Sequence, residues 1–203
     1  IQNLSIKEIM GKLFKKTIPT GEKHGTITVR LNETNYEVTT FRKEGPYRKY
    51  RWPVSVKFLK SAEEDAKRRD LTVNALFYDP DRAEVIDYVN GIADISHRRI
   101  RFIGKTEDRS REDARRMLRA VRFATVLKFD LSREAQKAIQ KNAKLIAQIS
   151  AERIKIELDK ILISDRAAIG FGLLDIVGLL DYILPEIKNM QGVTQPRNQH
   201  SEG

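Results

Sequence analysis

The chain has 203 residues, of which 40% are hydrophobic, and its 38 Lys and Arg against 28 Asp and Glu leave 38 − 28 = +10 at neutral pH. That composition is globular, and the absence of cysteine excludes disulfides, thiolate zinc sites and cysteine nucleophiles. The basic excess favours a polyanionic partner such as nucleic acid, although many basic proteins bind none.

Short strands and turns are predicted in the first half, after a helix over residues 6–14. Ile27, Val29 and Leu31 alternate with polar residues, and a turn-rich stretch separates them from a second strand over residues 36–41, which predicts a hairpin. A helix near residues 62–68 then leads to further strands, bounded by Asp, Pro, Asn or Gly, at residues 75–78, 85–88 and 99–103.

Helical periodicity replaces the strand pattern after about residue 108. Apolar residues recur at helical spacing in four runs, at residues 110–128, 132–147, 150–163 and 166–183. Three serines stand where N-caps belong, each followed by acidic residues: Ser110, Ser132 and Ser150. The second half is therefore predicted to be all-α.

These patterns indicate an α+β fold in which a mixed first unit precedes a helical one. We predict units over residues 1–105 and 106–188, and over residues 189–203 the start of a truncated or disordered C-terminal region. The apolar stretch at residues 171–184 contains Asp175 and Asp181, so we expect no membrane span, and no secretory signal opens the chain. A soluble, cytoplasmic protein is expected.

The segment RRDLTVNA, residues 68–75, lies between a charged helix and an apolar strand. The planar fork of Arg69 suits a phosphate or a base edge, and Asp70 beside it can fix the direction of that fork. Asn74 offers a donor and an acceptor, which suits a sugar hydroxyl. The alternative is a solvated helix end with Asn74 as a turn residue.

A second charged segment covers residues 111–123. On a continuous helix, Asp113 falls at the edge of the apolar arc, with Arg116 within pairing distance one turn on. Such a pair could offer donors and acceptors to a nucleobase edge, and more arginines cover the opposite side: Arg115, Arg119 and Arg122. Alternatively, Ser110 caps the helix with Asp113 as its third residue, and the arginines face water.

Carboxylates elsewhere suggest supporting roles. Glu152 and Glu157 could orient arginines of neighbouring helices, although a surface amphipathic helix is the alternative there. Glu37 is a candidate metal-binding carboxylate on a predicted strand, but one carboxylate does not make a magnesium site.

Five segments in this order resemble class II tRNA nucleotidyltransferases and bacterial poly(A) polymerases: YEVTTFR, RRDLTVNA, DYVNGIADI, EDARRMLRAVRF and ERIKIEL. The resemblance runs over most of the chain and implies a polymerase β-like nucleotidyltransferase head, with an antiparallel or mixed sheet, followed by an all-α neck. It also implies template-independent addition of C and A to the 3′ end of tRNA from CTP and ATP, with release of pyrophosphate. A poly(A) polymerase or a CC- or A-adding member is the alternative within the family, and a non-catalytic RNA-binding module the one outside it.

The resemblance carries roles over to particular residues. Contacts to the sugar and phosphates of the nucleotide are implied for Arg69, Asp70 and Asn74 of the RRDLTVNA segment. On the EDARR helix, Asp113 and Arg116 are implied to hydrogen-bond the incoming base, with Arg119 and Arg122 lining the same site. Supporting side chains behind them are Glu112, Glu152, Arg153 and Glu157. Gly91 and Asp94 are placed in the hinge between head and neck. The implied RNA contact is the tRNA acceptor stem and 3′ end.

The sequence departs from the family pattern in its first part. The family carries a glycine-rich motif and then an Asp-x-Asp pair that holds Mg²⁺, and neither is among these 203 residues. We expect the pair to precede Ile1, and its loss in evolution is the alternative. Glu37 would then be a third metal-binding carboxylate. Residues 44–53 replace an aspartate-glycine turn of the family, and the tail after residue 194 resembles the lead-in to an HD-type domain.

Overall fold

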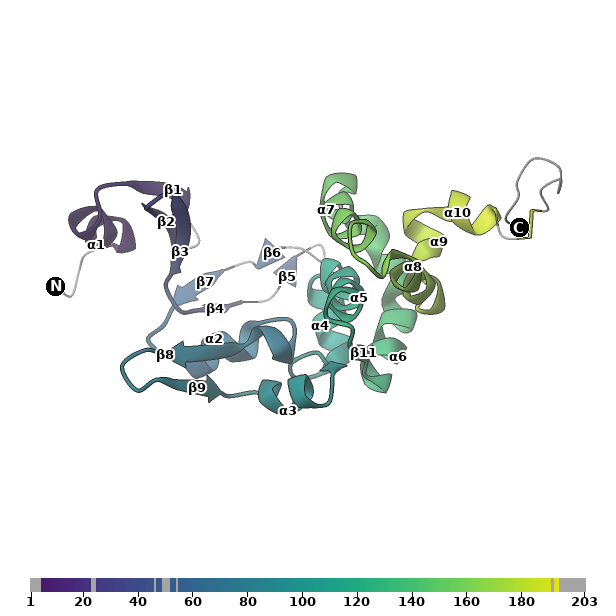
Figure 1. Cartoon of the computed structure of the whole chain (residues 1–203), viewed down its shortest axis with the longest axis horizontal. Coiled ribbons are helices and arrows are strands. Elements are labelled where there is room, and N and C mark those ends of the chain that lie inside the picture. Colours follow the sequence, from purple (N-terminus) through teal and green to yellow (C-terminus); the bar gives the residue numbers. More distant parts are fainter. Residues whose placement is uncertain are drawn as a thin grey trace.

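The computed structural model describes residues 5–22, 25–45, 47–48, 52–53, 55–190 and 192–193. Strands and short helices of the first half lie on one side of the molecule, and the helices of the second half lie on the other (Figure 1). The chain is therefore α+β in the predicted order. The predicted tail after residue 194 and part of the segment 44–53 lie outside the described residues.

The first half consists of small sheets with helices between them. Its helices are α1 (Ile6–Leu13), α2 (Ala62–Arg68) and α3 (Gly91–Ser96), with a 3-10 turn at Thr72–Asn74. Its strands are β1 (Thr17–Gly21), β2 (Thr26–Leu31), β3 (Thr34–Thr39), β4 (Arg42–Glu44), β5 (Tyr47–Arg48), β6 (Trp52–Pro53), β7 (Val56–Phe58), β8 (Leu76–Asp79), β9 (Glu84–Asp87) and β10 (Arg99–Ile100).

The predicted hairpin and the predicted helix over residues 62–68 are confirmed. Strands β2 and β3 pair antiparallel, with β1 on the other side of β2, and Ile27 and Val29 of β2 are buried. Strands β8 and β9 form a second antiparallel pair. Ser61 caps α2 by accepting a hydrogen bond from the Glu64 amide at 3.3 Å. Strands β1, β4 and β7 were not predicted, because none of them is long or strongly apolar.

The second half is helical apart from β11 (Asp130–Leu131), which pairs in parallel with β10. Its helices are α4 (Thr106–Glu112), α5 (Arg115–Leu127), α6 (Arg133–Asn142), α7 (Ala151–Leu162), α8 (Ala167–Ile176), α9 (Leu180–Ile183) and α10 (Pro185–Asn189), with 3-10 structure at Ala143–Gln148. Ser132 caps α6 as predicted, through the Ala135 amide at 3.1 Å.

The single helix predicted over residues 166–183 is wrong, because the chain breaks after α8. Gly178 has φ +73°, a left-handed conformation that ends a helix and that a side chain would disfavour. The amides of Gly178 and Leu179 donate to the carbonyls of Asp175 and Leu174, both at 2.9 Å, which satisfies the last turn of α8.

The main core joins both halves of the chain. Leu71, Ile100 and Phe102 from the first half are buried in the same cluster as Met117 and Val121 of α5. A smaller cluster, made of Ala66, Ala75 and Ile103, packs against Phe77 of β8 and Val89. This shared core crosses the predicted boundary after residue 105, and the division into two domains stays a prediction. No helix among the described residues combines the length and apolarity that a membrane crossing requires.

Close packing of α8 on its neighbours gives a testable expectation. A Cβ at Gly170 would lie 2.5 Å from Ile161 Cγ2 and 2.9 Å from Thr125 Cγ2, whereas one at Gly172 would meet no atom within 4 Å. Gly170→Ala should lower the free energy of unfolding by about 1–3 kcal/mol through overpacking. Gly172→Ala should raise it by about 0.5–1 kcal/mol, because alanine favours helix. Urea unfolding followed by circular dichroism measures both, and equal stability of the two variants would contradict the packing.

Candidate functional site

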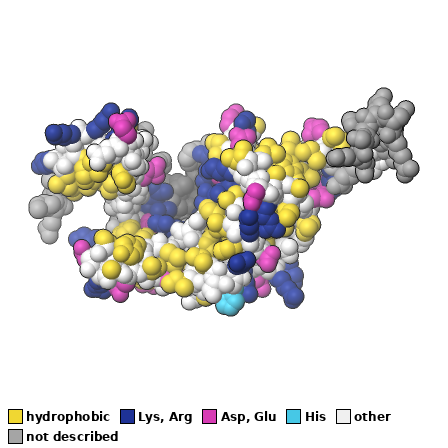
Figure 2. Space-filling model, viewed as in Figure 1, with side chains coloured by type: hydrophobic (Ala, Val, Ile, Leu, Met, Phe, Trp, Pro, Cys, Tyr) yellow, Lys and Arg dark blue, Asp and Glu magenta, His cyan; other side chains and the backbone are white. Residues whose placement is uncertain are grey.

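The predicted nucleotide-binding segments meet where the chain after α2 contacts helix α5, which in turn packs against α7. Figure 2 shows Lys and Arg side chains beside the recess between the strand-rich and helical parts of the molecule. Each charged side chain of this region has a definite partner, and the partners determine what the site can do.

Arg69 is fixed by the residues around it. Its Nε donates to Asp65 Oδ2 at 3.1 Å, its Nη1 donates to the Asn74 carbonyl at 2.9 Å, and its guanidinium lies 4.8 Å from the centre of the Phe77 ring. Asp65 is buried and also accepts from the Arg42 amide and from Arg68 Nε. Arg69 therefore joins the end of α2 to the 3-10 turn that carries Asn74.

Asp70 links this segment to α5. Its Oδ1 accepts from the Leu71 amide at 2.9 Å, and its Oδ2 accepts from Arg119 Nε. Burial alone would raise the pKa of Asp70, but the charge and hydrogen bond of Arg119 outweigh it, so the pKa is lowered. Asp70 is ionised at neutral pH, and the same contact raises the pKa of Arg119 against its own burial.

The helix predicted to start at Ser110 is wrong. Helix α4 begins at Thr106 and ends at Glu112, Asp113 is extended with φ −140° and ψ 105°, and α5 begins at Arg115. Ser110 is not a cap but lies buried within α4, where it accepts from Asn142 Nδ2 at 2.7 Å. The break occurs at Asp113, whose Oδ1 accepts from the Arg115 amide at 3.0 Å and so satisfies a free donor of the new helix.

This break changes the predicted pairing. Arg116 Nη1 donates to Glu112 Oε2 at 2.5 Å, whereas Asp113 Oδ2 lies 3.7 Å from Arg115 Nη2. The sequence predicted an Asp113–Arg116 fork, because a continuous helix would put them on one face. Burial is the main cause of the raised pKa of Asp113, which the charge of Arg115 only partly offsets. The pKa of Glu112 is lowered, because Arg116 and Arg109 outweigh its burial.

The arginines on the other side of α5 do not form a solvated row. Arg122 is buried and donates from Nε to Glu157 Oε2 at 2.6 Å, and Arg119 Nη1 lies 3.9 Å from Glu157 Oε1. Glu157 on α7 is 3% exposed, so this helix orients arginines of α5 and is not simply a surface helix. Glu152 is exposed on α7, and the half-buried Arg153 adds positive charge near Asp113.

The two predicted hinge residues lie on α3 against the 3-10 turn. A Cβ at Gly91 would lie 2.4 Å from the Thr72 carbonyl, so only glycine allows this approach. Asp94 is buried and accepts from Thr72 Oγ1 at 2.7 Å and from Arg101 Nε at 2.8 Å. Together they attach α3 to the segment that carries Asn74, and hinge motion itself stays a prediction.

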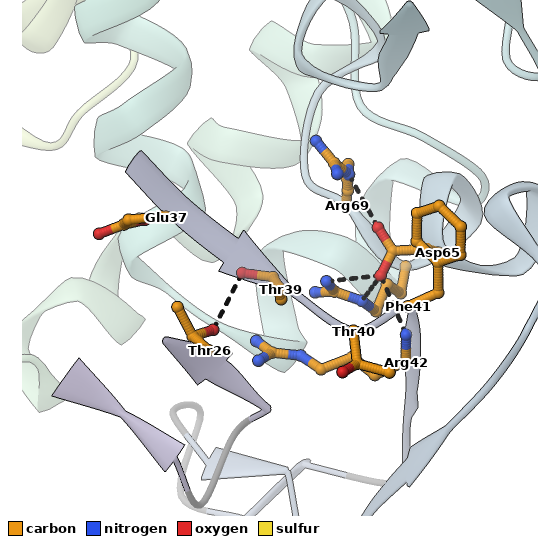
Figure 3. Close-up of a pocket in the computed structure, with 9 residues that line it drawn as sticks. Thr26, Glu37, Thr39, Thr40, Phe41, Arg42, Asp65 and Arg69 are labelled. Carbon is orange, nitrogen blue, oxygen red and sulfur yellow. Dashed lines mark hydrogen bonds and ion pairs between the residues drawn. The ribbon is translucent and has the colours of Figure 1, made fainter. Parts of the chain in front are cut away.

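Glu37 lies apart from these side chains, on β3. It lines a hollow of about 290 Å³ together with Arg42, Asp65 and Arg69, and Figure 3 shows it on the other side of that hollow from Asp65 and its hydrogen bonds. The described residues contain no group of three His, Cys, Asp or Glu side chains that could hold a metal ion. By themselves they therefore do not fit a Mg²⁺ ion.

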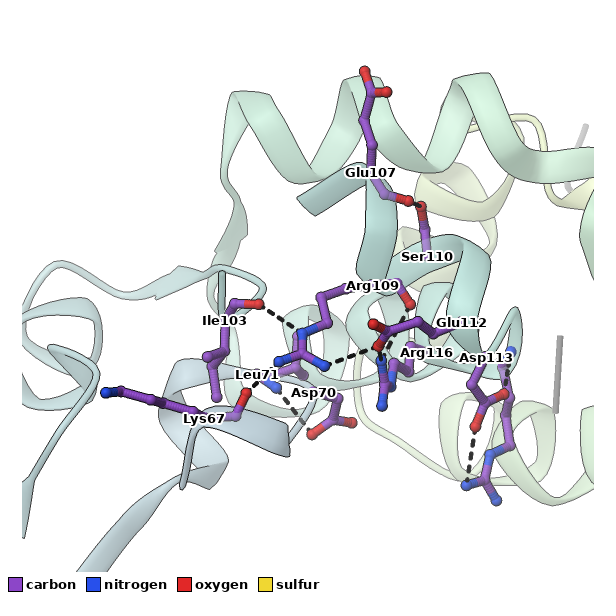
Figure 4. A network of polar contacts seen from close by, with 11 residues as sticks. Lys67, Asp70, Leu71, Ile103, Glu107, Arg109, Ser110, Glu112, Asp113 and Arg116 are labelled. Carbon is purple, nitrogen blue, oxygen red and sulfur yellow. Dashed lines mark hydrogen bonds and ion pairs between the residues drawn. The ribbon is translucent and has the colours of Figure 1, made fainter. Parts of the chain in front are cut away.

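Two charged residues of the region were not predicted. Asp65 stands three and four residues before Arg68 and Arg69, a helical pairing distance that could have revealed it. Arg109 contacts the carbonyls of Lys67 and Ile103 and the Glu112 carboxylate (Figure 4). Its contact with Lys67 spans 42 residues of sequence, and no local pattern signals it.

Two protein families match the chain. The family "Poly A polymerase head domain" matches residues 3–101, and the family "Probable RNA and SrmB- binding site of polymerase A" matches residues 128–191. The CCA-adding enzyme of Geobacillus kaustophilus (strain HTA426) is 45% identical over 183 residues, which are 90% of this chain and 45% of that protein.

Solved structures resemble the chain over most of its length. The crystal structure of Bacillus stearothermophilus CCA-adding enzyme in complex with CTP is 41% identical, with a TM-score of 0.81 over 93% of this chain and 46% of that one. A tRNA nucleotidyltransferase complexed with a primer tRNA and an incoming ATP analog is 25% identical, with a TM-score of 0.70 over 96% of this chain and 54% of that one. The chain thus spans about half the length of these proteins.

The pairing of Asp70 with Arg119 predicts a pH dependence. Because the pKa of Asp70 is lowered in the folded state, its contribution to stability is present above the unfolded pKa of about 4 and is lost as pH falls further. Between pH 6 and pH 3, wild type should lose more unfolding free energy than Asp70→Asn, by up to about 1.3 kcal/mol, because pH 3 lies only about one unit below the unfolded pKa. Urea unfolding at both pH values measures this. Asp81→Asn, at an exposed turn, should follow wild type, and parallel losses in all three proteins would contradict the assignment.

Proposed function

The chain belongs to the family of class II tRNA nucleotidyltransferases and bacterial poly(A) polymerases, and we propose that its full-length protein adds C and A nucleotides to the 3′ end of tRNA. The observation that carries the proposal is the likeness to the CTP-bound CCA-adding enzyme, at 41% identity over 93% of this chain. CTP and ATP are the proposed substrates, pyrophosphate is the second product, and cytoplasm is the proposed location.

Base selection is assigned to Asp113 and Arg116. Cytosine and adenine both carry an exocyclic amino group beside a ring nitrogen that accepts a hydrogen bond, whereas uracil and guanine carry an oxygen beside an N–H. A carboxylate that accepts from the amino group and a guanidinium that donates to the ring nitrogen therefore favour C and A. Asp113 accepts from the Arg115 amide with one oxygen, and an ionised carboxylate has further acceptor capacity for a base.

The sugar and phosphates are assigned to the segment of Arg69, Asp70 and Asn74. In support, Arg69 is bonded to the Asn74 carbonyl and Asp70 to Arg119 of α5, so the segment and the base-selecting helix are held in one arrangement. Arg119 and Arg122 are proposed to line the same site, with Glu157 between them. Glu112, Glu152 and Arg153 are proposed to support it from behind.

Mg²⁺ is proposed as the cofactor of the full-length protein. Metal ions in phosphoryl-type transfer neutralise charge and position the reacting oxygens. The described residues do not by themselves form such a site, and Glu37 is proposed only as an additional carboxylate. The basic surface is proposed to hold the tRNA acceptor stem through phosphates and shape, which requires no sequence readout.

Incorporation by the full-length protein tests the activity. The protein is incubated with Mg²⁺, labelled CTP or ATP and a tRNA transcript without its terminal CCA, and product lengths are read on a gel. Ordered addition of C, C and A is expected. Long tails of A alone would indicate the poly(A) polymerase instead, and tRNA binding without any incorporation would indicate the non-catalytic RNA-binding module.

A substitution at Asp113 tests base selection. Asp113→Ala should lower the ratio of kcat/KM for CTP to that for UTP by about tenfold or more, because a lost hydrogen bond to a charged group is worth about 1.5–3 kcal/mol. The Kd for tRNA should stay within about twofold of wild type in the same experiment. Asp159→Ala, which removes a surface carboxylate of α7, is the matched control. Equal loss of selection and of tRNA binding by Asp113→Ala would oppose the assignment.

A further inference from the structure

Arg109 joins three segments that are separate in sequence. From α4, its Nε donates to the Ile103 carbonyl at 2.9 Å, its Nη1 donates to Glu112 Oε2 at 2.8 Å, and its Nη2 donates to the Lys67 carbonyl at the end of α2. All three nitrogens of the guanidinium are engaged, and Figure 4 shows Arg109 between Ile103 and Lys67 on one side and Glu112 on the other.

The Glu112 carboxylate connects Arg109 to Arg116. One oxygen, Oε2, accepts from Arg109 Nη1 at 2.8 Å and from Arg116 Nη1 at 2.5 Å. Arg116 Nη1 also lies 3.4 Å from the Arg109 carbonyl. The Arg116 side chain is 7% exposed, so it has little room to change direction without its partners. A shift of Arg109 would therefore move the carboxylate that holds Arg116.

The segment after α2 is attached to the α4–α5 pair at two points. One point is the Lys67 carbonyl, bonded to Arg109, and the other is Asp70, bonded to Arg119. Arg69 lies between them in sequence, so this proposed phosphate-binding residue is flanked on both sides by contacts to α4 and α5. Two contacts restrict the movement of the segment relative to α4 and α5 more than a single contact would.

The geometry points to Arg109 as a positioning residue that holds Arg116, through Glu112, in register with the segment of Arg69 and Asp70. This inference rests on the proposed function and adds to it a residue that does not itself touch the nucleotide. Arg109 affects nucleotide selection through Arg116. If Arg116 is displaced relative to the sugar and phosphate site, its guanidinium no longer meets the edge of the bound base. A displacement of about 1 Å is enough to cost a large factor in rate.

Arg109→Lys is the sharp test, because it retains the charge and removes the planar fork. A single lysine ammonium group cannot hydrogen-bond the Ile103 carbonyl, the Lys67 carbonyl and the Glu112 carboxylate at the same time, as the guanidinium does. In the full-length protein, the ratio of kcat/KM for CTP to that for UTP should fall about tenfold, with the Kd for tRNA unchanged. Arg82→Lys, at an exposed turn of the β8–β9 hairpin, is the matched control and should retain the wild-type ratio.

A double-mutant cycle separates positioning from general stabilisation. In an Arg116→Met background, Arg109→Lys should cause no further fall in the CTP to UTP ratio, because its effect passes through Arg116. A wild-type ratio in Arg109→Lys, or an equal further fall in the Arg116→Met background, would overturn the inference.

If Arg109→Lys does not fold, Glu112→Gln interrupts the same connection and leaves the two carbonyl contacts of Arg109 in place. The same loss of the CTP to UTP ratio is expected for this variant. A wild-type protein that does not discriminate between CTP and UTP would instead refute the proposed function.

Discussion

Helix α5 carries three arginines into or beside the apolar core, and that is possible only because carboxylates of other elements neutralise each of them. A buried guanidinium without a partner is costly, so the carboxylates fix where α5 can lie and how it is rotated about its axis. The pairs are Arg116 with Glu112, Arg119 with Asp70 and Arg122 with Glu157. These carboxylates come from α4, from the segment after α2 and from α7, so one helix organises the whole site.

The same contacts make the proposed head and neck dependent on each other. Asp70 and the Lys67 carbonyl belong to the first half of the chain, and both bind arginines of the second half. Leu71 and Phe102 extend this connection into the main apolar core. Motion between the halves would have to occur elsewhere or break these contacts, and the Asp94 contacts with Thr72 and Arg101 lie beside them on the strand-rich side.

Asp113 shows how a local preference changes a site. Aspartate favours helix ends because its carboxylate can accept from free backbone amides. Here Asp113 follows the last residue of α4 and accepts from the amide of Arg115, the first residue of α5. Asp113 lies beside Arg115, whereas Arg116 pairs with Glu112, four residues before it. The proposed selection of C and A thus relies on two side chains with separate supports, and each support can be altered on its own.

Local periodicity, turn chemistry and motif letters were enough to predict the α+β order, the β2–β3 hairpin, α2 and the resemblance to the family. Arg69, Asp70 and Glu157 could also be picked out from the sequence, since their segments carry the resemblance. The helix break at Asp113 and the ion-pair partners of the arginines could be established from the folded structure alone. A continuous helical pattern hid the break at Asp113. Arg109, Arg119 and Arg122 each have a partner that stands 35 to 49 residues away in sequence. Periodicity describes which face of a helix is apolar, but which carboxylate meets an arginine depends on how separate elements pack.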